Sequence, residues 1–306
     1  MRIAIMAAGG VGGYFGARLA VAGHDVIFFA RGKHREAIAR DGLKIESPLG
    51  NLHLRQVTLA DDPAKIGPVD IVLFAVKLWD LEQAARQLKP LIGPNTRVIT
   101  LQNGVDAEEK LGPILGAEHV VPGITQLATV IGSPGVISHT SPFALLRFGH
   151  NDGHSDPVLD AFVAAGQKAG IDIALSDSAP RDVWAKFTML CAMAGMTAST
   201  RKPIGPLLAD PDTRALFHDI MKEIVLVARA KGVPLPADFA DNRLAYAETT
   251  LPKQMKASMA HDLERGNRLE LDWLNGRVVQ LGREVGIPTP ANAAVYAVLK
   301  PYRMGS

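Results

Sequence analysis

The feature that most constrains the fold is a glycine-rich turn directly after a short apolar segment at the N-terminus. The run Arg2–Ala7 has the length of one strand, and residues 7–13 (Ala-Ala-Gly-Gly-Val-Gly-Gly) lead into a helical pattern over Val11–Ala22. In a strand–turn–helix unit, Gly9 lets the backbone approach a pyrophosphate and Gly12 lets the helix pack closely against the strand. The pattern therefore predicts a dinucleotide-binding turn, with alanine in place of the first fingerprint glycine. An ordinary surface helix after a glycine-rich turn is the alternative.

The residues after the second expected strand, Asp25–Ala30, indicate which dinucleotide binds. Many NAD-dependent proteins place an acidic residue there to bind the ribose 2′-hydroxyl, whereas this chain has Arg31, followed by Lys33, His34 and Arg35. An arginine suits a 2′-phosphate, so NADP(H) is favoured over NAD. The alternative is a solvated basic helix start.

The chain as a whole changes character near its middle. Residues up to about 150 alternate short apolar runs with amphipathic segments, which is typical of βαβ units and a parallel sheet. Further strands are expected at Asp70–Val76, Arg97–Leu101, Ala128–Ile131, Val136–His139 and Ala144–Phe148, with a small antiparallel excursion at Leu43–Ile45 and Leu52–Val57. Helical periodicity then covers Asp182–Thr197, Thr213–Lys231 and Pro252–Val285. We expect an α/β protein, with a Rossmann-type parallel sheet domain over residues 1–178 and an all-α domain over residues 179–306.

Composition excludes several other classes of protein. Lysine and arginine total 33 against 31 acidic residues, so nucleic acid is not an expected partner. The uncharged run Ile3–Ala17 is similar to a secretory signal, but its five glycines break such a helix, and no stretch reaches the roughly 20 apolar residues of a membrane span. The single cysteine, Cys191, lies in an apolar run and is expected to be a buried thiol. We expect a cytoplasmic protein with no membrane partner and no metal site.

Several spaced motifs resemble the ketopantoate reductase (2-dehydropantoate 2-reductase) family over nearly the whole chain. They are Gly9-Gly10-Val11-Gly12-Gly13-Tyr14-Phe15-Gly16, Ala75-Val76-Lys77, Gln102-Asn103-Gly104, Trp184-Ala185-Lys186, Ser258-Met259-Ala260-His261-Asp262, Glu270 and Asn275-Gly276. The resemblance implies reduction of a 2-oxo acid with NADPH. It also implies that Gly10 lies with Gly9 and Gly12 at the pyrophosphate. Lys77 and Asn103 would lie at the nicotinamide end, Asn103 would also reach substrate, and Ala128 would lie along the cofactor.

The same resemblance makes Lys186 the general acid. Hydride that arrives at a carbonyl carbon leaves charge on the oxygen, which a positioned ammonium can stabilise and protonate. Glu270 would orient this lysine or the cofactor ribose, and Ser258 would hydrogen-bond the substrate carboxylate or hydroxyl. From the residues alone, Lys186 could simply extend from a helix into solvent, and Glu270 could be a surface acid.

Three positions depart from the family pattern, which has asparagines four and eight residues after the lysine and before a later glycine. Here these positions hold Leu190, Ala194 and Ile204. Leu190 and Ala194 share one helix stripe with Lys186, so the wall beside the lysine is apolar. Loss of hydrogen-bonding groups favours a less polar substrate.

We therefore expect an NADPH-dependent reductase of ketopantoate or of a less polar 2-oxo acid. The alternatives are another hydroxyacid or opine-type dehydrogenase of the same architecture, and a non-catalytic NADP(H)-binding sensor. An apolar helical second domain is also compatible with a homodimer.

Overall fold

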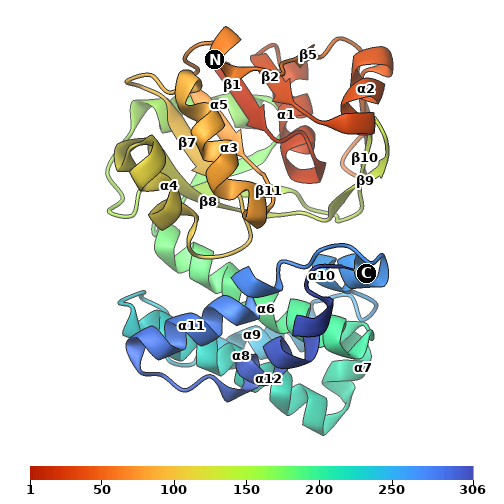
Figure 1. Ribbon diagram of the computed structural model, residues 1–306, viewed down its shortest axis with the longest axis vertical. Coiled ribbons are helices and arrows are strands. Elements are labelled where there is room, and N and C mark those ends of the chain that lie inside the picture. The colour runs from red at the N-terminus through yellow and green to blue at the C-terminus, as the bar shows by residue number, and fades with distance from the viewer. Residues whose placement is uncertain (306) are drawn as a thin grey trace. The chain divides into compact units, whose positions relative to one another are not determined.

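The computed structural model describes residues 1–305, which form two compact units (Figure 1). Unit 1 comprises Met1–Gln102 and Asp106–Ala179, and unit 2 comprises Asn103–Val105 and the residues from Pro180 onward. None of the helices within residues 1–305 is long and apolar enough to cross a membrane.

Unit 1 is built on an eight-stranded sheet with the order β12-β11-β8-β7-β6-β1-β2-β5. The strands are β1 (Arg2–Met6), β2 (Asp25–Phe29), β5 (Thr58–Leu59), β6 (Ile71–Phe74), β7 (Arg97–Thr100), β8 (Val120–Gln126), β11 (Leu145–Phe148) and β12 (Asp172–Leu175). In the part of this order that runs β8-β7-β6-β1-β2-β5, every pair of adjacent strands is parallel. β11 runs antiparallel to β8. The inner strands are apolar and buried nearly throughout, as parallel strands covered on both faces require. The predicted Rossmann-type sheet is confirmed.

The helices of unit 1 follow the strands as βαβ connections. They are α1 (Gly10–Val21), α2 (Gly32–Asp41), α3 (Leu81–Leu88), α4 (Ala107–Leu115) and α5 (Pro157–Lys168). The α5 helix and the β12 strand after it were not anticipated from the sequence. Asp156 caps α5 by accepting a hydrogen bond from the N–H of Val158, and Leu159 and Phe162 bury one helix face in the core.

A second sheet of four strands contains the expected antiparallel excursion. Its strands are β3 (Leu43–Glu46), β4 (Leu52–Leu54), β9 (Thr129–Ser133) and β10 (Val136–His139), in the order β4-β3-β10-β9. The β3–β4 pair is antiparallel, as expected, and the β9–β10 pair is antiparallel as well. The parallel pairing of β10 with β3 joins the two hairpins into one sheet, and this pairing was not anticipated. β11 joins the large sheet instead of extending the β9–β10 hairpin.

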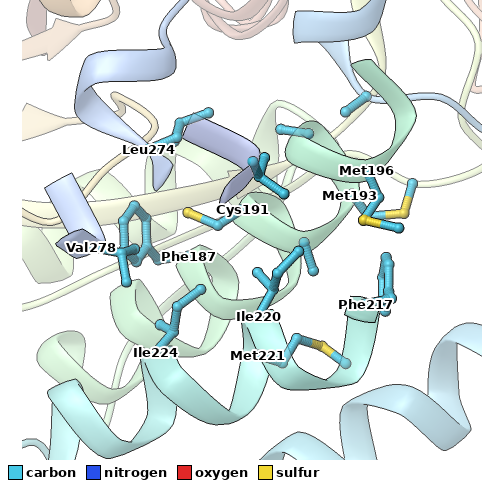
Figure 2. Close-up of a cluster of buried hydrophobic side chains, with 14 of the residues drawn as sticks. Phe187, Cys191, Met193, Met196, Phe217, Ile220, Met221, Ile224, Leu274 and Val278 are labelled. Carbon is cyan, nitrogen blue, oxygen red and sulfur yellow. The ribbon is translucent and has the colours of Figure 1, made fainter. Parts of the chain in front are cut away.

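Unit 2 is helical, as predicted for the second half of the chain. Its helices are α6 (Ala179–Thr200), α7 (Ile204–Ala209), α8 (Pro211–Ala230), α9 (Phe239–Thr249), α10 (Ser258–Glu264), α11 (Asn275–Val285) and α12 (Pro290–Leu299). The region expected to be helical over Pro252–Val285 is interrupted, because α10 ends before Gly266, which has a φ of 67°. Figure 2 shows Cys191 of α6 among buried side chains such as Phe187 and Ile220. Cys191 is a free and fully buried cysteine, which confirms the expected buried thiol, and burial raises the pKa of this thiol.

A buried polar network holds the helices of unit 2 around α6. The Glu223 carboxylate on α8 accepts hydrogen bonds from the backbone N–H groups of Ala291 and Asn292 in the first turn of α12. Unpaired N–H groups and the helix dipole stabilise a carboxylate at this position. The Asn292 side chain accepts a hydrogen bond from Asn275 Nδ2, which also donates to the carbonyl of Cys191. Four helices are thereby tied together at the middle of α6.

Candidate functional site

The glycine-rich turn lies between β1 and α1, and its glycines meet two different requirements. Gly9 is the N-cap residue of α1, and a Cβ built on it would meet nothing within 4 Å. A Cβ on Gly12 would clash with the carbonyl oxygen of Ala7, so glycine is needed there for close packing of helix and strand. Among residues 1–305, Arg201 is the only non-glycine residue with a positive φ, so Ala7 keeps the negative φ that alanine needs at the first fingerprint position. Open backbone at Gly9 suits the approach of a pyrophosphate.

A buried hydroxyl lies next to this helix N-terminus. A Cβ on Gly10 would be 2.9 Å from Thr129 Oγ1 on β9. That oxygen is buried and has no hydrogen-bond partner within the described chain. Buried polar groups are nearly always paired, so a ligand oxygen at the turn would satisfy both the hydroxyl and the first N–H groups of α1. The residues present therefore fit a bound dinucleotide. Sequence reasoning missed Thr129, because nothing local marks it as a neighbour of the turn.

Several residues assigned to the cofactor, together with Gln102, follow the carboxyl ends of neighbouring parallel strands. The turn with Gly9 follows β1, Arg31 follows β2, Lys77 comes after β6, Gln102 follows β7 and Ala128 follows β8. The strand order β8-β7-β6-β1-β2 brings these five ends to one edge of the sheet. Ligands of open parallel sheets bind at that edge.

The contacts of Lys77, Ala128 and Gln102 at this edge differ in kind. The exposed Lys77 ammonium lies 5.5 Å from the centre of the Trp79 ring. Ala128 is exposed, and its N–H donates to Ser141 Oγ at 2.9 Å. Gln102 Nε2 donates to the carbonyl of Phe74, whereas Gln102 Oε1 is buried without a partner among residues 1–305. The amide oxygen of Gln102 is thus a second polar atom that a bound ligand could satisfy.

The basic residues after β2 divide into exposed and engaged side chains. Arg31 is the N-cap residue of α2, and both Arg31 and Lys33 are exposed. Arg35 forms an ion pair with Asp61, with an N–O distance of 2.6 Å. Arg31 and Lys33 are therefore the side chains available to a 2′-phosphate.

His34 turns inward and connects the nucleotide turn to the β9–β10 hairpin. Its Nδ1 accepts a hydrogen bond from the N–H of Gly135, and its Nε2 donates to the carbonyl of Ala8, both at 3.0 Å. This pair of contacts requires the neutral imidazole with its proton on Nε2. Burial lowers the pKa of His34, and the hydrogen bond to Ala8 opposes this shift. Sequence reasoning counted His34 only as part of the basic cluster.

The His34 contacts predict a pH dependence of stability. The unfolded histidine gains a proton as the pH falls below about 6.5, whereas the folded one resists protonation, so the free energy of unfolding should decrease there. The contribution of one such group is at most about 1.4 kcal/mol per pH unit. Melting temperatures between pH 7.5 and 5.5 should therefore fall less steeply for His34→Gln, which can still donate and accept, than for the wild type. His154→Gln provides a comparison at an exposed histidine, where the contact with the exposed Asp152 is worth little, so its slope should differ less from the wild type than that of His34→Gln. Equal slopes for all three proteins would contradict the prediction.

In unit 2, three of the residues implied by the resemblance come together. Lys186 on α6 is partly buried, and Glu270 is only 7% exposed. Burial lowers the pKa of Lys186 to about 8, while the nearby negative charge of Glu270 acts in the opposite direction. Asn103 Nδ2 donates a long hydrogen bond of 3.5 Å to Glu270 Oε2. Burial therefore makes this lysine release its proton more readily than an exposed lysine does. The negative charge of Glu270 limits the effect, because it favours the charged ammonium.

The remaining expected substrate residues lie on α6 itself and on α10. Leu190 is partly buried and Ala194 is 1% exposed, and their spacing in α6 places both on the same face as Lys186. Ile204 is the first residue of α7 and belongs to the core. Ser258 is the exposed first residue of α10, and it forms no hydrogen bond with Lys186, Glu270 or Asn103 in the described part of the chain. In residues 1–305 no cluster of three or more His, Cys, Asp or Glu side chains could hold a metal ion.

Comparison with known proteins identifies the family. The family models described as "Ketopantoate reductase PanE/ApbA" and "Ketopantoate reductase PanE/ApbA C terminal" match residues 3–153 and 179–303. The chain belongs to the ketopantoate reductase family. The family resemblance seen in the motifs is thereby confirmed, whereas the replacement of family asparagines at 190, 194 and 204 stays a prediction.

Full-length relatives of the ketopantoate reductase family support the same assignment. The chain is 32% identical over 321 residues to the 2-dehydropantoate 2-reductase of Mesorhizobium japonicum, covering 98% of this chain and 97% of that protein. It is 31% identical over 303 residues to the uncharacterized oxidoreductase YkpB of Bacillus subtilis, covering 99% of each. The crystal structure of a PanE/ApbA family ketopantoate reductase from Ralstonia eutropha JMP134 is similar with a TM-score of 0.88 and 34% identity, covering 99% of this chain and 98% of that one. The chain is an oxidoreductase of this family.

Proposed function

We propose that the chain reduces a 2-oxo acid to a 2-hydroxy acid with NADPH, acting on ketopantoate or a less polar analogue. The observation that carries the proposal is the buried Lys186 within the electrostatic influence of Glu270, in an oxidoreductase of this family. Burial brings the pKa of this lysine to about 8, close to the pH at which a general acid works best.

NADPH, when bound, supplies the hydride that adds to the carbonyl carbon of the substrate. Lys186 holds the proton that the carbonyl oxygen takes up, and its positive charge stabilises the negative charge that develops there. At neutral pH a lysine with a pKa of about 8 is mostly protonated, yet it gives up its proton far more readily than an ordinary lysine. Glu270 keeps the ammonium charged and oriented, and Asn103 in turn holds the Glu270 carboxylate.

The cofactor assignments combine the family resemblance with contacts at the sheet edge. Gly9, Gly10 and Gly12 with the start of α1 would hold the pyrophosphate, and Arg31 the 2′-phosphate. By resemblance, the remaining cofactor residues are Lys77, Asn103, Ala128 and Glu270. The open space at Gly9 and the unpaired Thr129 hydroxyl support this assignment.

The residues assigned to the substrate divide into polar residues, which would bind its polar end, and apolar residues, which would line its alkyl chain. Ser258 and Asn103 would hydrogen-bond the polar end of the 2-oxo acid. Leu190 and Ala194 would form an apolar wall on the same helix face as Lys186. An apolar wall favours an alkyl chain over the hydroxymethyl group of ketopantoate, because a buried hydroxyl without a partner costs about 1–3 kcal/mol.

The test follows NADPH absorbance with two substrates that differ by one hydroxyl, ketopantoate and 3,3-dimethyl-2-oxobutanoate. The wild type should have a kcat/KM roughly tenfold higher for the compound without the hydroxyl. Replacement of Leu190→Asn with Ala194→Asn should shift the preference toward ketopantoate, because amide groups return one and two turns from Lys186. Since Ala194 is 1% exposed, Leu190→Asn alone and the melting temperature of each variant are measured as well.

The results separate the competing functions. NADPH binding without turnover of any 2-oxo acid would indicate a sensor instead of a reductase. A wild type that prefers ketopantoate, with a double variant no better, would show that Leu190 and Ala194 do not select the substrate.

A further inference from the structure

We propose that Thr197 is a positioning residue that fixes Ser258 relative to Lys186. Thr197 on α6 is fully buried, and its Oγ1 donates to the carbonyl of Met193 at 2.6 Å. The same oxygen accepts a hydrogen bond of 3.3 Å from the N–H of Ala257, the residue directly before Ser258. The inference rests on the proposed function, in which Ser258 binds the substrate.

The position of Thr197 on α6 connects it to Lys186. It lies eleven residues after Lys186 in one continuous helix, which is close to three full turns at 3.6 residues per turn. Thr197 therefore continues the helix face that carries Lys186, Leu190 and Ala194. The lysine and the anchor for the Ser258 segment are thus parts of the same rigid element.

The chain before Ser258 is fastened to the end of α6 and the start of α7. The N–H of Ile204 donates to the carbonyl of Met255 at 3.0 Å, and the N–H of Gly205 donates to the carbonyl of Lys253 at 2.8 Å. Backbone approaches so closely here that a Cβ on Gly205 would lie 2.9 Å from the Lys253 oxygen. The bond from Ala257 to Thr197 is the last of these three contacts before Ser258, and it alone uses a side chain.

Ala257 determines where α10 begins. It is the N-cap residue of α10, and its carbonyl accepts from the N–H of Ala260. Its own N–H lies outside the helical hydrogen-bond pattern and is bound by Thr197. Removal of the Thr197 hydroxyl leaves this buried N–H without its partner, so the segment must shift or admit water. Either change moves Ser258, the next residue.

Thr188 provides a matched comparison on the same helix. It is also fully buried, and its Oγ1 donates to the carbonyl of Trp184, four residues earlier, at 2.8 Å. Threonine hydroxyls in helices commonly donate to the carbonyl of the preceding turn in this way. Thr197 makes the same bond and adds the bond from Ala257. A comparison of the two threonines therefore isolates the contact to the Ser258 segment.

The experiment compares Thr197→Val, Thr197→Ser and Thr188→Val by steady-state kinetics with the preferred 2-oxo acid. Valine keeps the shape of threonine and removes the hydroxyl, whereas serine keeps the hydroxyl and removes a methyl group. We expect KM for the 2-oxo acid to rise about tenfold in Thr197→Val, equivalent to about 1.4 kcal/mol. Thr197→Ser and Thr188→Val should keep the wild-type KM, and kcat and the Kd for NADPH should stay unchanged in all three.

Amide hydrogen exchange of the peptide that contains Ala257 and Ser258 gives a readout independent of activity. Exchange should become faster in Thr197→Val alone. Suppose that the wild type is active, and that Thr197→Val has the same KM and the same exchange rate as Thr188→Val. This result would overturn the inference about Thr197 and leave the proposed function standing. If the wild type reduces no 2-oxo acid, the proposed function fails, and the positioning role falls with it. The wild-type assay therefore distinguishes the two failures.

Discussion

Replacement of Lys186 with methionine should lower turnover of the 2-oxo acid by at least about 100-fold, the usual loss when a general acid is removed. Methionine keeps much of the volume of the lysine stem and deletes the ammonium, so the packing of α6 should be largely kept. Folding and the Kd for NADPH should change little. Single-turnover kinetics, the melting temperature and cofactor titration measure the three quantities separately.

The pH profile gives Lys186 a signature that a structural role would not produce. Burial lowers its pKa to about 8, and in the proposed mechanism reduction requires the protonated amine. The rate of 2-oxo acid reduction should therefore fall as the pH rises through about 8, while oxidation of the 2-hydroxy acid, which needs the neutral amine, should rise over the same range. Lys168→Met, at an exposed position, should keep both the rate and the profile. Near-normal turnover in Lys186→Met would leave Lys186 as a lysine that merely extends from its helix.

The parts of the fold that were predictable from sequence are those set by neighbouring residues. The strand, turn and helix at the N-terminus were located within one residue of β1 (Arg2–Met6) and α1 (Gly10–Val21), because apolar periodicity and glycines act locally. The pairing of β3 with β10 joins residues about 90 positions apart, and no local period encodes it. The α5 helix was missed because Gly149–Ser155 before it has the composition of a domain end.

In the candidate site, too, contacts between residues far apart in the sequence could not be predicted. Lys186 was found through its motif, but its pKa of about 8 depends on burial and on Glu270, which lies far along the chain. The hydrogen bonds of His34 with Ala8 and Gly135 likewise arise only in the folded unit. Thr197 carried a usable signal, since its spacing continues the face of Lys186. That signal predicts a shared face and says nothing of the bond to Ala257.

Removal of the Arg31 side chain should weaken NADPH binding by about 10- to 150-fold, which corresponds to loss of one charge-assisted contact worth about 1.5–3 kcal/mol. The wild type should bind NADPH more tightly than NADH, because Arg31 stands where an acid would bind the 2′-hydroxyl of NAD. Arg35 cannot readily replace it, since its guanidinium is engaged with Asp61. The affinity for NADH, which has no 2′-phosphate, should be nearly the same in Arg31→Ala and in the wild type.

The Arg31 prediction is best tested by fluorescence titration of both cofactors at two salt concentrations. Arg40→Ala is the matched control, because Arg40 lies near the other end of α2 and is paired with the adjacent Asp41. The control should keep the preference for NADPH. Phosphate recognition also predicts that added salt weakens NADPH binding more in the wild type than in Arg31→Ala, since an exposed charge contact is screened by ions. Equal affinities of the wild type for NADPH and NADH, or an NADPH affinity that Arg31→Ala leaves unchanged, would remove Arg31 from the cofactor site and leave it as a solvated residue at the start of α2.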